Sequence, residues 1–371
     1  MSGWKSKQGK VRVLIADDSE LARVVLHRLL SSDPEIEVVG MATRGDEVAD
    51  MVERLAPDIV TMDLRMPGLD GLAATAEIMK RCPTPVIIVT SSGIVGRKDD
   101  VFASFKYGVV DVIQKPDAVG SSPAALTLIE KVKILSRVRV SGDVWSPGLR
   151  SKSLRPLVKP VWRDTRAIGV GASTGGPRAL HRVLTGLPAD LPMPVFVVQH
   201  MSEGFVPGFA EWLGVDLALD LRIAQDGDRP RPGQVLLAPG GANMLVDERF
   251  IVRLNKDPPE TGILPSVDVL LLSLARTYGA DALGVVLTGI GKDGAQGMAA
   301  MKAAGGVTLV QDERSCVVFG MPNAAIAVGA VDEVLSLDLI ADRLLTLTGY
   351  EPKAEADRSA GSEPGVEPSG S

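Results

Sequence analysis

The stretch AIGVGASTGGPRAL, residues 167 to 180, decides the fold of the second half of the chain. Its apolar start is typical of a buried parallel strand, and its glycines predict a tight turn into a helix at Ser173. Two later runs of the same kind are VFVVQ, which precedes His200, and LGVVLTGIGK, which precedes Asp293. Ligands of open parallel sheets bind outside the carboxyl ends of the strands. We therefore expect these three side chains to share one crevice.

Serine, histidine and aspartate are the residues that serine hydrolases use as nucleophile, general base and orienting carboxylate. His27 and His181 fall inside helical patterns, which leaves His200 as the candidate base. Asp293 has an alternative role as a helix cap. The chain order of serine, histidine and aspartate differs from that of the α/β-hydrolases.

A second interpretation of the glycine-rich turn is a dinucleotide site, because GVGASTGG loosely matches the fingerprint that cradles a pyrophosphate. Such a site needs an acidic residue at the end of the next strand, to bind a ribose hydroxyl. Gln199 and His200 stand there instead. This position favours the hydrolase over the nucleotide site.

The first part of the chain alternates strand-like and helical patterns, with strands of the type VRVLIA, IEVVGM, DIVTM, PVIIVT and DVIQ. These patterns predict an α/β fold with two doubly wound parallel sheets, flavodoxin-like and then Rossmann-like. We place the first domain at residues 10–130, a linker rich in Ser, Gly and Pro at 131–163, the second domain at 164–350 and a disordered tail at 351–371.

Five polar residues end strands of the first domain, namely Asp17, Asp18, Asp63, Thr90 and Lys115. Three carboxylates at one edge repel one another unless a hard cation lies among them, and Mg²⁺ prefers carboxylates, water and phosphate oxygens. The set therefore indicates phosphoryl transfer, with Asp63 attacking in line, Lys115 and Mg²⁺ offsetting its charge, and the Thr90 hydroxyl donating to a phosphoryl oxygen.

The sequence of DD, MDLRMPGLDG, T and KP over about residues 10 to 130 closely resembles the receiver domain of two-component response regulators. The resemblance implies that Asp63 is the phosphoacceptor, that Asp17, Asp18 and Asp63 hold Mg²⁺, and that a histidine kinase is the phosphodonor. Where many receivers carry an aromatic switch residue, three positions before the lysine, this chain has Val112.

The second domain resembles the methylesterase domain of the CheB family, as judged from IGVGASTGGPRAL, VVQHM, GFVPGFA, APGG, LPSVDVL, VVLTGIGKDGAQGM and QDERSCVVFGMPNAAI. The resemblance implies a protein-glutamate methylesterase of chemoreceptors that releases methanol and deamidates receptor glutamines. Ser173, His200 and Asp293 would be catalytic, with no metal at this site. The backbone N–H groups of Thr174 and Ile290 would form the oxyanion hole.

Three positions depart from the pattern of this family, in which basic residues are common. Trp212, Asn243 and the stretch TGIL at residues 261–264 stand there. We expect a cationic rim for acidic receptor helices to be depleted, and substrate choice to be atypical.

Composition and net charge limit the classes of binding partner to expect. The 371 residues carry a net charge of -6, and the second domain lacks a helix-turn-helix pattern or a basic recognition helix, so a nucleic-acid partner is disfavoured. Charge, Gly or Pro interrupts every apolar run, so direct membrane insertion is not expected. Only two cysteines and no signal peptide predict a reduced, cytoplasmic protein. A receiver-controlled binding module without catalysis remains the alternative from another functional class.

Overall fold

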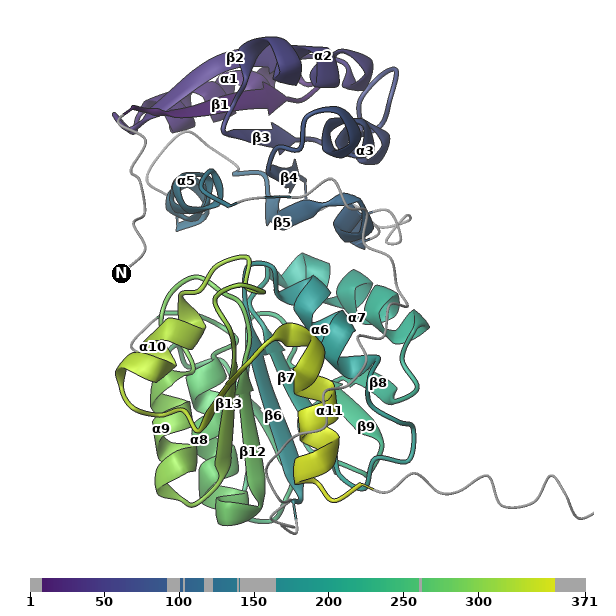
Figure 1. Cartoon of the computed structure of the whole chain (residues 1–371), viewed down its shortest axis with the longest axis vertical. Coiled ribbons are helices and arrows are strands. Elements are labelled where there is room, and N and C mark those ends of the chain that lie inside the picture. Colours follow the sequence, from purple (N-terminus) through teal and green to yellow (C-terminus); the bar gives the residue numbers. More distant parts are fainter. Residues whose placement is uncertain are drawn as a thin grey trace, which may run out of the picture.

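The computed structural model describes residues 9–91, 101–102, 104–116, 123–138, 140, 165–259 and 262–350. These residues form two units, each built on a parallel sheet (Figure 1). The predicted fold class is confirmed. The predicted tail and residues 141–163 of the predicted linker lie outside the described residues. Within the described part of the chain, every helix is too short or too polar to cross a bilayer.

The first unit has five parallel strands in the order β2-β1-β3-β4-β5, which is the flavodoxin-like order. One face carries α1 and α5, and the other carries α2 and α3. The strands are β1 Val11–Ala16, β2 Ile36–Ala42, β3 Ile59–Met62, β4 Val86–Thr90 and β5 Val109–Gln114. The helices are α1 Glu20–Ser31, α2 Gly45–Leu55, α3 Gly71–Arg81, the 3-10 helix η1 Ser104–Tyr107 and α5 Pro123–Leu135.

The helix α5 extends past residue 130, where we predicted that the first domain ends. Leu128, Val132 and Leu135 are buried against α1 and the sheet, so the helix keeps its apolar face to its last residue. Lys131 also forms an ion pair with Asp111 of β5, at 2.8 Å. The packed unit therefore includes the first residues of the predicted linker.

The second unit has seven parallel strands in the order β14-β13-β12-β6-β7-β9-β8. Its strands are β6 Ala167–Ala172, β7 Val195–Gln199, β8 Asp220–Ile223, β9 Gln234–Leu237, β12 Ala282–Val286, β13 Val307–Gln311 and β14 Glu333–Leu335. An antiparallel hairpin that the sequence patterns did not predict, β10 Asn243–Val246 with β11 Val252–Asn255, precedes α8.

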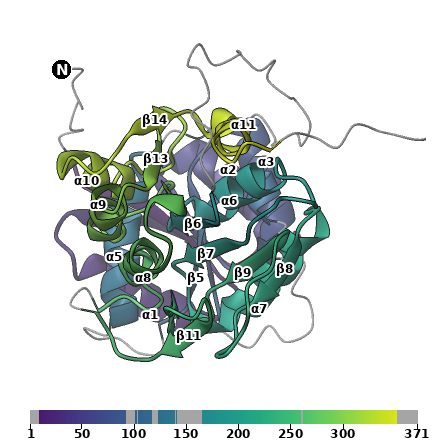
Figure 2. The same ribbon diagram turned by 90° about the horizontal axis from the view of Figure 1, so that it is seen from below.

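Helices cover both faces of the second sheet (Figure 2). One face carries α8 Val267–Tyr278, α9 Ala295–Ala303 and α10 Met321–Ala327, and the other carries α6 Gly176–Leu184, α7 Val206–Val215 and α11 Leu337–Leu347. Two 3-10 turns, η2 Glu203–Phe205 and η3 Gly279–Asp281, lie in the connections.

Glycines in β6 let α8 pack unusually close to the sheet. A Cβ atom at Gly171 would lie 2.2 Å from Cγ1 of Val267, and one at Gly169 would lie 2.6 Å from Cδ1 of Leu274. Val267 is β-branched and stiff, so it has little freedom to move aside. The small residues of AIGVGA therefore place the amino end of α8 beside the end of β6.

We predict that Gly171→Ala lowers the free energy of unfolding by about 1–3 kcal/mol, because the added methyl group overpacks the contact with Val267. Urea unfolding measures the change. Gly214→Ala in α7 is the matched control, since a Cβ atom there meets nothing within 4 Å. Removing a helical glycine should raise stability by up to about 1 kcal/mol. Equal losses in both variants would contradict this explanation of the close packing.

Candidate functional site

Ser173 and His200 lie at adjacent strand ends. Ser173 follows β6, and its backbone N–H donates to the carbonyl of Thr288, after β12, at 3.0 Å. His200 follows β7, and its N–H donates to the carbonyl of Ala172 at 3.0 Å. Backbone hydrogen bonds thus hold the candidate nucleophile between the strand that ends in the base and the strand that leads to Asp293.

His200 and Asp293 are hydrogen-bonded. The imidazole Nε2 lies 2.8 Å from Oδ2 of Asp293. The His200 side chain is 11% exposed, and Asp293 is buried. Since Nε2 faces the carboxylate, Nδ1 is the nitrogen left to accept a proton from the Ser173 hydroxyl. Among the described residues, no hydrogen bond joins that hydroxyl to the ring, which is common before substrate binds.

The amino end of α8 binds the Asp293 carboxylate. Its Oδ1 accepts from the Ser266 hydroxyl and the Asp268 N–H, both at 2.9 Å, and its Oδ2 accepts from the Val267 N–H at 2.7 Å. A helix amino end favours an anion because its N–H groups are unpaired. Burial alone would raise the pKa of Asp293, but His200 and these N–H groups lower the pKa below its usual value. The carboxylate stays charged and able to orient the imidazole.

Two residues that the sequence analysis did not assign to the site support this arrangement. Ser266 caps α8 through its hydroxyl, which also donates to Asp293. Asn243 is buried, and its Oδ1 accepts from the Ser266 N–H at 2.9 Å. Its amide also donates to the Asn255 side chain and the Asp257 carbonyl. A Ser before VDVL is a recognisable cap signal, but Asn243 carried no sequence signal for this contact.

Gln199 holds the backbones of the candidate nucleophile and base together. Its amide Nε2 donates to the carbonyl of Ser173 at 2.8 Å and to that of His200 at 3.0 Å. A Cβ atom at Gly176 would lie 2.0 Å from Oε1 of Gln199, so the second glycine of the turn is required for this clamp. Both amide hydrogens of Gln199 are therefore used inside the turn, and its Oε1 is buried against Gly176 with no hydrogen-bond partner among the described residues.

Two backbone donors border Ser173. The N–H groups of Thr174 and Ile290 have no acceptor within the described part of the chain. A Cβ atom at Gly289 would lie 2.7 Å from Cβ of Ser173, so the loop that carries Ile290 is against the nucleophile. These two groups are thus free to donate to a ligand beside Ser173, and their role as an oxyanion hole stays a prediction.

Asp268 has an unusual pKa beside this pair. Burial and the negative charge of Asp293 raise the pKa of Asp268 from 3.8 to about 6, although the Gly297 N–H opposes the shift. A carboxyl with a raised folded pKa destabilises the fold when it is ionised. This loss of folding stability is fully present above pH 6. It disappears as the pH falls toward the pKa that Asp268 has in the unfolded chain.

We predict that Asp268→Asn raises the free energy of unfolding at pH 8 by about 1–2 kcal/mol, after allowance for partial exposure, and has little effect at pH 4. Urea unfolding at both pH values measures the difference. Asp342→Asn, which removes an exposed carboxylate of α11, is the control. A stabilisation that is equal at both pH values would contradict the assignment.

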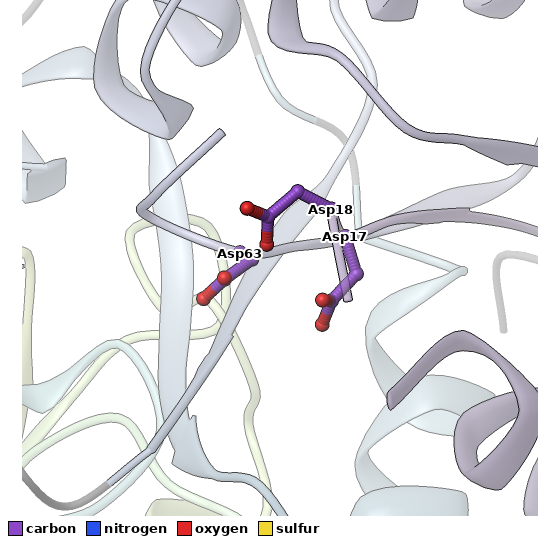
Figure 3. Close-up of side chains that lie close together, drawn as sticks. All are labelled: Asp17, Asp18 and Asp63. Carbon is purple, nitrogen blue, oxygen red and sulfur yellow. The ribbon is translucent and has the colours of Figure 1, made fainter. Parts of the chain in front are cut away.

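The first unit brings three carboxylates together at the end of its sheet. One oxygen from each of Asp17, Asp18 and Asp63 lies within 4.8 Å of the others (Figure 3). Lys115 Nζ lies 2.8 Å from Oδ2 of Asp17 and 3.1 Å from Oδ2 of Asp63. Thr90 ends β4, and its carbonyl accepts from the Lys115 N–H at 2.8 Å. The structure therefore gathers all five residues that we predicted for this edge.

The charge of this cluster fits a divalent cation. Burial raises the pKa of Asp63, and Asp17 raises it further, while Lys115 opposes the shift. A single ammonium group thus leaves the crowded carboxylates undercompensated. Oxygen ligands and excess negative charge are what Mg²⁺ requires.

The two units contact each other at the candidate nucleophile. The Thr174 hydroxyl donates to Oδ2 of Asp111, in β5, at 2.7 Å, and Lys131 binds the same oxygen. A second contact between the units is aromatic: the Phe102 ring lies against Phe209 and Trp212 of α7, with centroids 5.5 and 6.2 Å from its own. In Figure 1, β5 and α5 face the end of the second unit that carries α6 and α7.

Comparisons with known proteins cover both units of the chain. A family model described as CheB methylesterase matches residues 168–344, and one described as response regulator receiver domain matches residues 13–123. Protein-glutamate methylesterase/protein-glutamine glutaminase 2 of Anaeromyxobacter dehalogenans is 42% identical over 339 residues, which cover 91% of this chain and 97% of the relative. The chain belongs to the CheB methylesterase family.

Other CheB relatives are similarly close. Protein-glutamate methylesterase/protein-glutamine glutaminase 4 of Geobacter metallireducens is 40% identical and covers 91% of this chain and 99% of its own length. The crystal structure of the Thermotoga maritima CheB methylesterase catalytic domain is 36% identical, covers 49% of this chain and 98% of its own, and has a TM-score of 0.48. Both family matches fall inside the domains predicted from the sequence.

The structure shows where two of the residues that depart from the CheB pattern lie. Trp212 is 8% exposed and packs in the contact between the domains, and Asn243 is 1% exposed beneath α8. We had interpreted both positions as part of an altered surface rim. Neither side chain lies in one, because apolar packing covers Trp212 and hydrogen bonds occupy Asn243. Of the stretch TGIL, Thr261 lies outside the described residues.

Proposed function

We propose that this CheB family member is a phosphorylation-activated serine hydrolase that cleaves glutamate methyl esters on chemoreceptors and deamidates receptor glutamines. The observation that supports it most strongly is the hydrogen bond of 2.8 Å between the partly buried His200 and the buried Asp293, beside Ser173 at the same sheet edge. The relatives that match nearly the whole chain carry both activities in their names.

The chemistry follows from the site. The Ser173 hydroxyl attacks the ester carbonyl while His200 takes its proton on Nδ1, and Asp293 stabilises the resulting imidazolium through Nε2. The tetrahedral oxyanion accepts hydrogen bonds from the N–H groups of Thr174 and Ile290, each worth roughly 3–4 kcal/mol. As the bond from carbon to the methoxy oxygen breaks, His200 gives the proton to that oxygen, methanol departs, and an acyl-serine remains.

Hydrolysis of the acyl-serine repeats these steps with water. His200 removes a proton from the water as it attacks the acyl carbon, then protonates Ser173 as the glutamate carboxylate is released. In deamidation the leaving group is ammonia instead of methanol. Both reactions therefore use the same three side chains, and none of these steps requires a metal.

In the receiver domain we propose that Asp63 accepts a phosphoryl group from the phosphohistidine of a chemotaxis-type histidine kinase. When bound, Mg²⁺ held by Asp17, Asp18 and Asp63 would offset the negative charge of the phosphoryl oxygens. Lys115 lies within reach of Asp17 and Asp63 and supplies a second positive charge. Thr90 ends β4, the strand next to β3, and its hydroxyl would donate to the phosphoryl group.

The domain contact supports a gate. Asp111 binds the hydroxyl of Thr174, the residue that follows the nucleophile, and Lys115 lies four residues further along the same strand and its loop. A phosphoryl group on Asp63 would attract the Lys115 ammonium and so shift the end of β5. The middle of the same strand carries Asp111, which binds Thr174. We propose that phosphorylation shifts the docking of β5 and α5, and thereby opens the crevice to a receptor helix.

The test is methanol release from membranes that carry methylated chemoreceptors, with and without a small phosphodonor. Wild-type protein should be stimulated by the phosphodonor, and Asp63→Asn should lose that stimulation. Ser173→Ala should lower the rate by roughly 10⁴-fold or more. Asp50→Asn, which removes an exposed carboxylate of α2, is the matched control and should keep the stimulation.

Two results would contradict the proposal. Full methanol release by Ser173→Ala would exclude the serine mechanism. Equal wild-type rates with and without the phosphodonor, under conditions in which Asp63 is shown to be phosphorylated by mass spectrometry, would exclude the gate.

A further inference from the structure

A cavity of about 350 Å³ lies beside the nucleophile turn, on the face of the sheet covered by α6 and α11. It is lined by Gly175, Arg178 and Arg182 on one side and by Thr288, Gln311 and Asp338 on the other. Thr288 connects it directly to the catalytic turn. Its carbonyl accepts from the Ser173 N–H, and its hydroxyl donates to the Thr174 carbonyl at 3.0 Å. The volume is within the usual range of ligand sites.

Most polar groups around this cavity are occupied by protein partners. Arg182 binds Asp338 at 2.7 Å. The Gln311 side chain accepts from the Thr288 N–H at 2.9 Å and donates to the Ser315 carbonyl at 2.7 Å. These groups form the walls of the cavity and are not available to a ligand without loss of their own contacts.

Arg178 is the exception. Its guanidinium is half-buried, and no hydrogen bond or ion pair to it occurs in the part of the chain that the structure describes. Burial lowers the pKa of Arg178, and no neighbouring carboxylate offsets that effect. Arg178 also stands in the first turn of α6, where the helix dipole disfavours a cation. A half-buried cation in this position is energetically favourable only when an anion forms an ion pair with it.

The planar guanidinium matches a carboxylate with two parallel hydrogen bonds. If the proposed function is correct, the substrate is a polypeptide with glutamate side chains, and an unmodified glutamate near the methylated one offers this group. Trp212 and Asn243, which stand where basic residues are common in the family, do not supply this contact because both are buried. We propose that Arg178 binds the carboxylate of an acidic side chain that flanks the glutamate ester in the substrate.

This inference rests on the proposed function and makes Arg178 a specificity-determining residue. It predicts that the enzyme prefers esters in acidic sequence contexts. Arg178 does not touch the reacting atoms, so the preference is expected in KM more than in kcat. Val317 lines the cavity and also packs against the receiver domain, so the experiment uses the full chain with a small phosphodonor present.

The test compares methyl-ester peptides in which each flanking glutamate is replaced singly by glutamine. For each protein the readout is the ratio of kcat/KM for the acidic peptide to kcat/KM for the neutral peptide, so a general loss of activity cancels. Wild type should prefer glutamate by roughly tenfold or more at one flanking position. Arg178→Gln should bring this ratio close to one, and Arg178→Lys should retain part of it.

Arg249→Gln is the matched control, because it removes an exposed arginine far along the chain in the β10–β11 hairpin and should keep the wild-type ratio. A wild-type ratio that persists in Arg178→Gln would overturn the proposal, and so would a wild-type ratio of one at every position. Failure of wild type to cleave any ester peptide would instead reject the proposed function.

A second arm distinguishes a free carboxylate from a polypeptide side chain. Glutarate is added to the full-length protein, and the melting temperature is compared between wild type and Arg178→Gln. A rise that requires Arg178, together with no preference for acidic peptides, would assign the cavity to a small free dicarboxylate and overturn its role in substrate recognition. A peptide preference without a glutarate effect supports the proposal.

Discussion

The binding of the Asp293 carboxylate by the amino end of α8 is the interaction on which the candidate active site depends. It joins three segments that are distant in sequence, since Asp293 follows β12, His200 follows β7 and α8 packs over β6. The close approach of α8 requires the glycines of β6, so the strand that precedes Ser173 also positions the helix that binds the Asp293 carboxylate. A buried charge is tolerated because several hydrogen bonds replace its water.

The two domains build their sites at the same place in the sheet, but the carboxylates there have pKa values shifted in opposite directions. Each places polar residues at the carboxyl ends of parallel strands, where they converge. In the catalytic domain the carboxylate is fully hydrogen-bonded and its pKa is lowered, which suits a fixed orienting role. In the receiver domain the carboxylates are crowded and the pKa of Asp63 is raised, which suits a site that gains a cation and a phosphoryl group. The hydrogen bond between Thr174 and Asp111 joins the two domains at the residue that follows Ser173.

The sequence was sufficient for the sheets and the strand-end residues, because buried strands and glycine-rich turns leave local patterns. It could not supply the supporting contacts. Asn243 reaches Ser266 across 23 positions, and no local pattern encodes that distance. Trp212 was interpreted as part of an altered substrate rim, whereas apolar packing with Phe102 places it between the domains. The roles of Gln199 and Arg178 likewise depend on which neighbours are already hydrogen-bonded, which only the folded arrangement reveals.

The most direct test of the account is the protonation of the His200 ring, observed by ¹⁵N NMR at a pH where the imidazole is neutral. We predict that Nε2 carries the proton, hydrogen-bonded to Asp293, and that Nδ1 is unprotonated and available to Ser173. The signal should disappear in His200→Gln and lose its strong hydrogen-bond shift in Asp293→Asn. A proton on Nδ1 in the wild-type protein, or an Nε2 signal unchanged by Asp293→Asn, would contradict it.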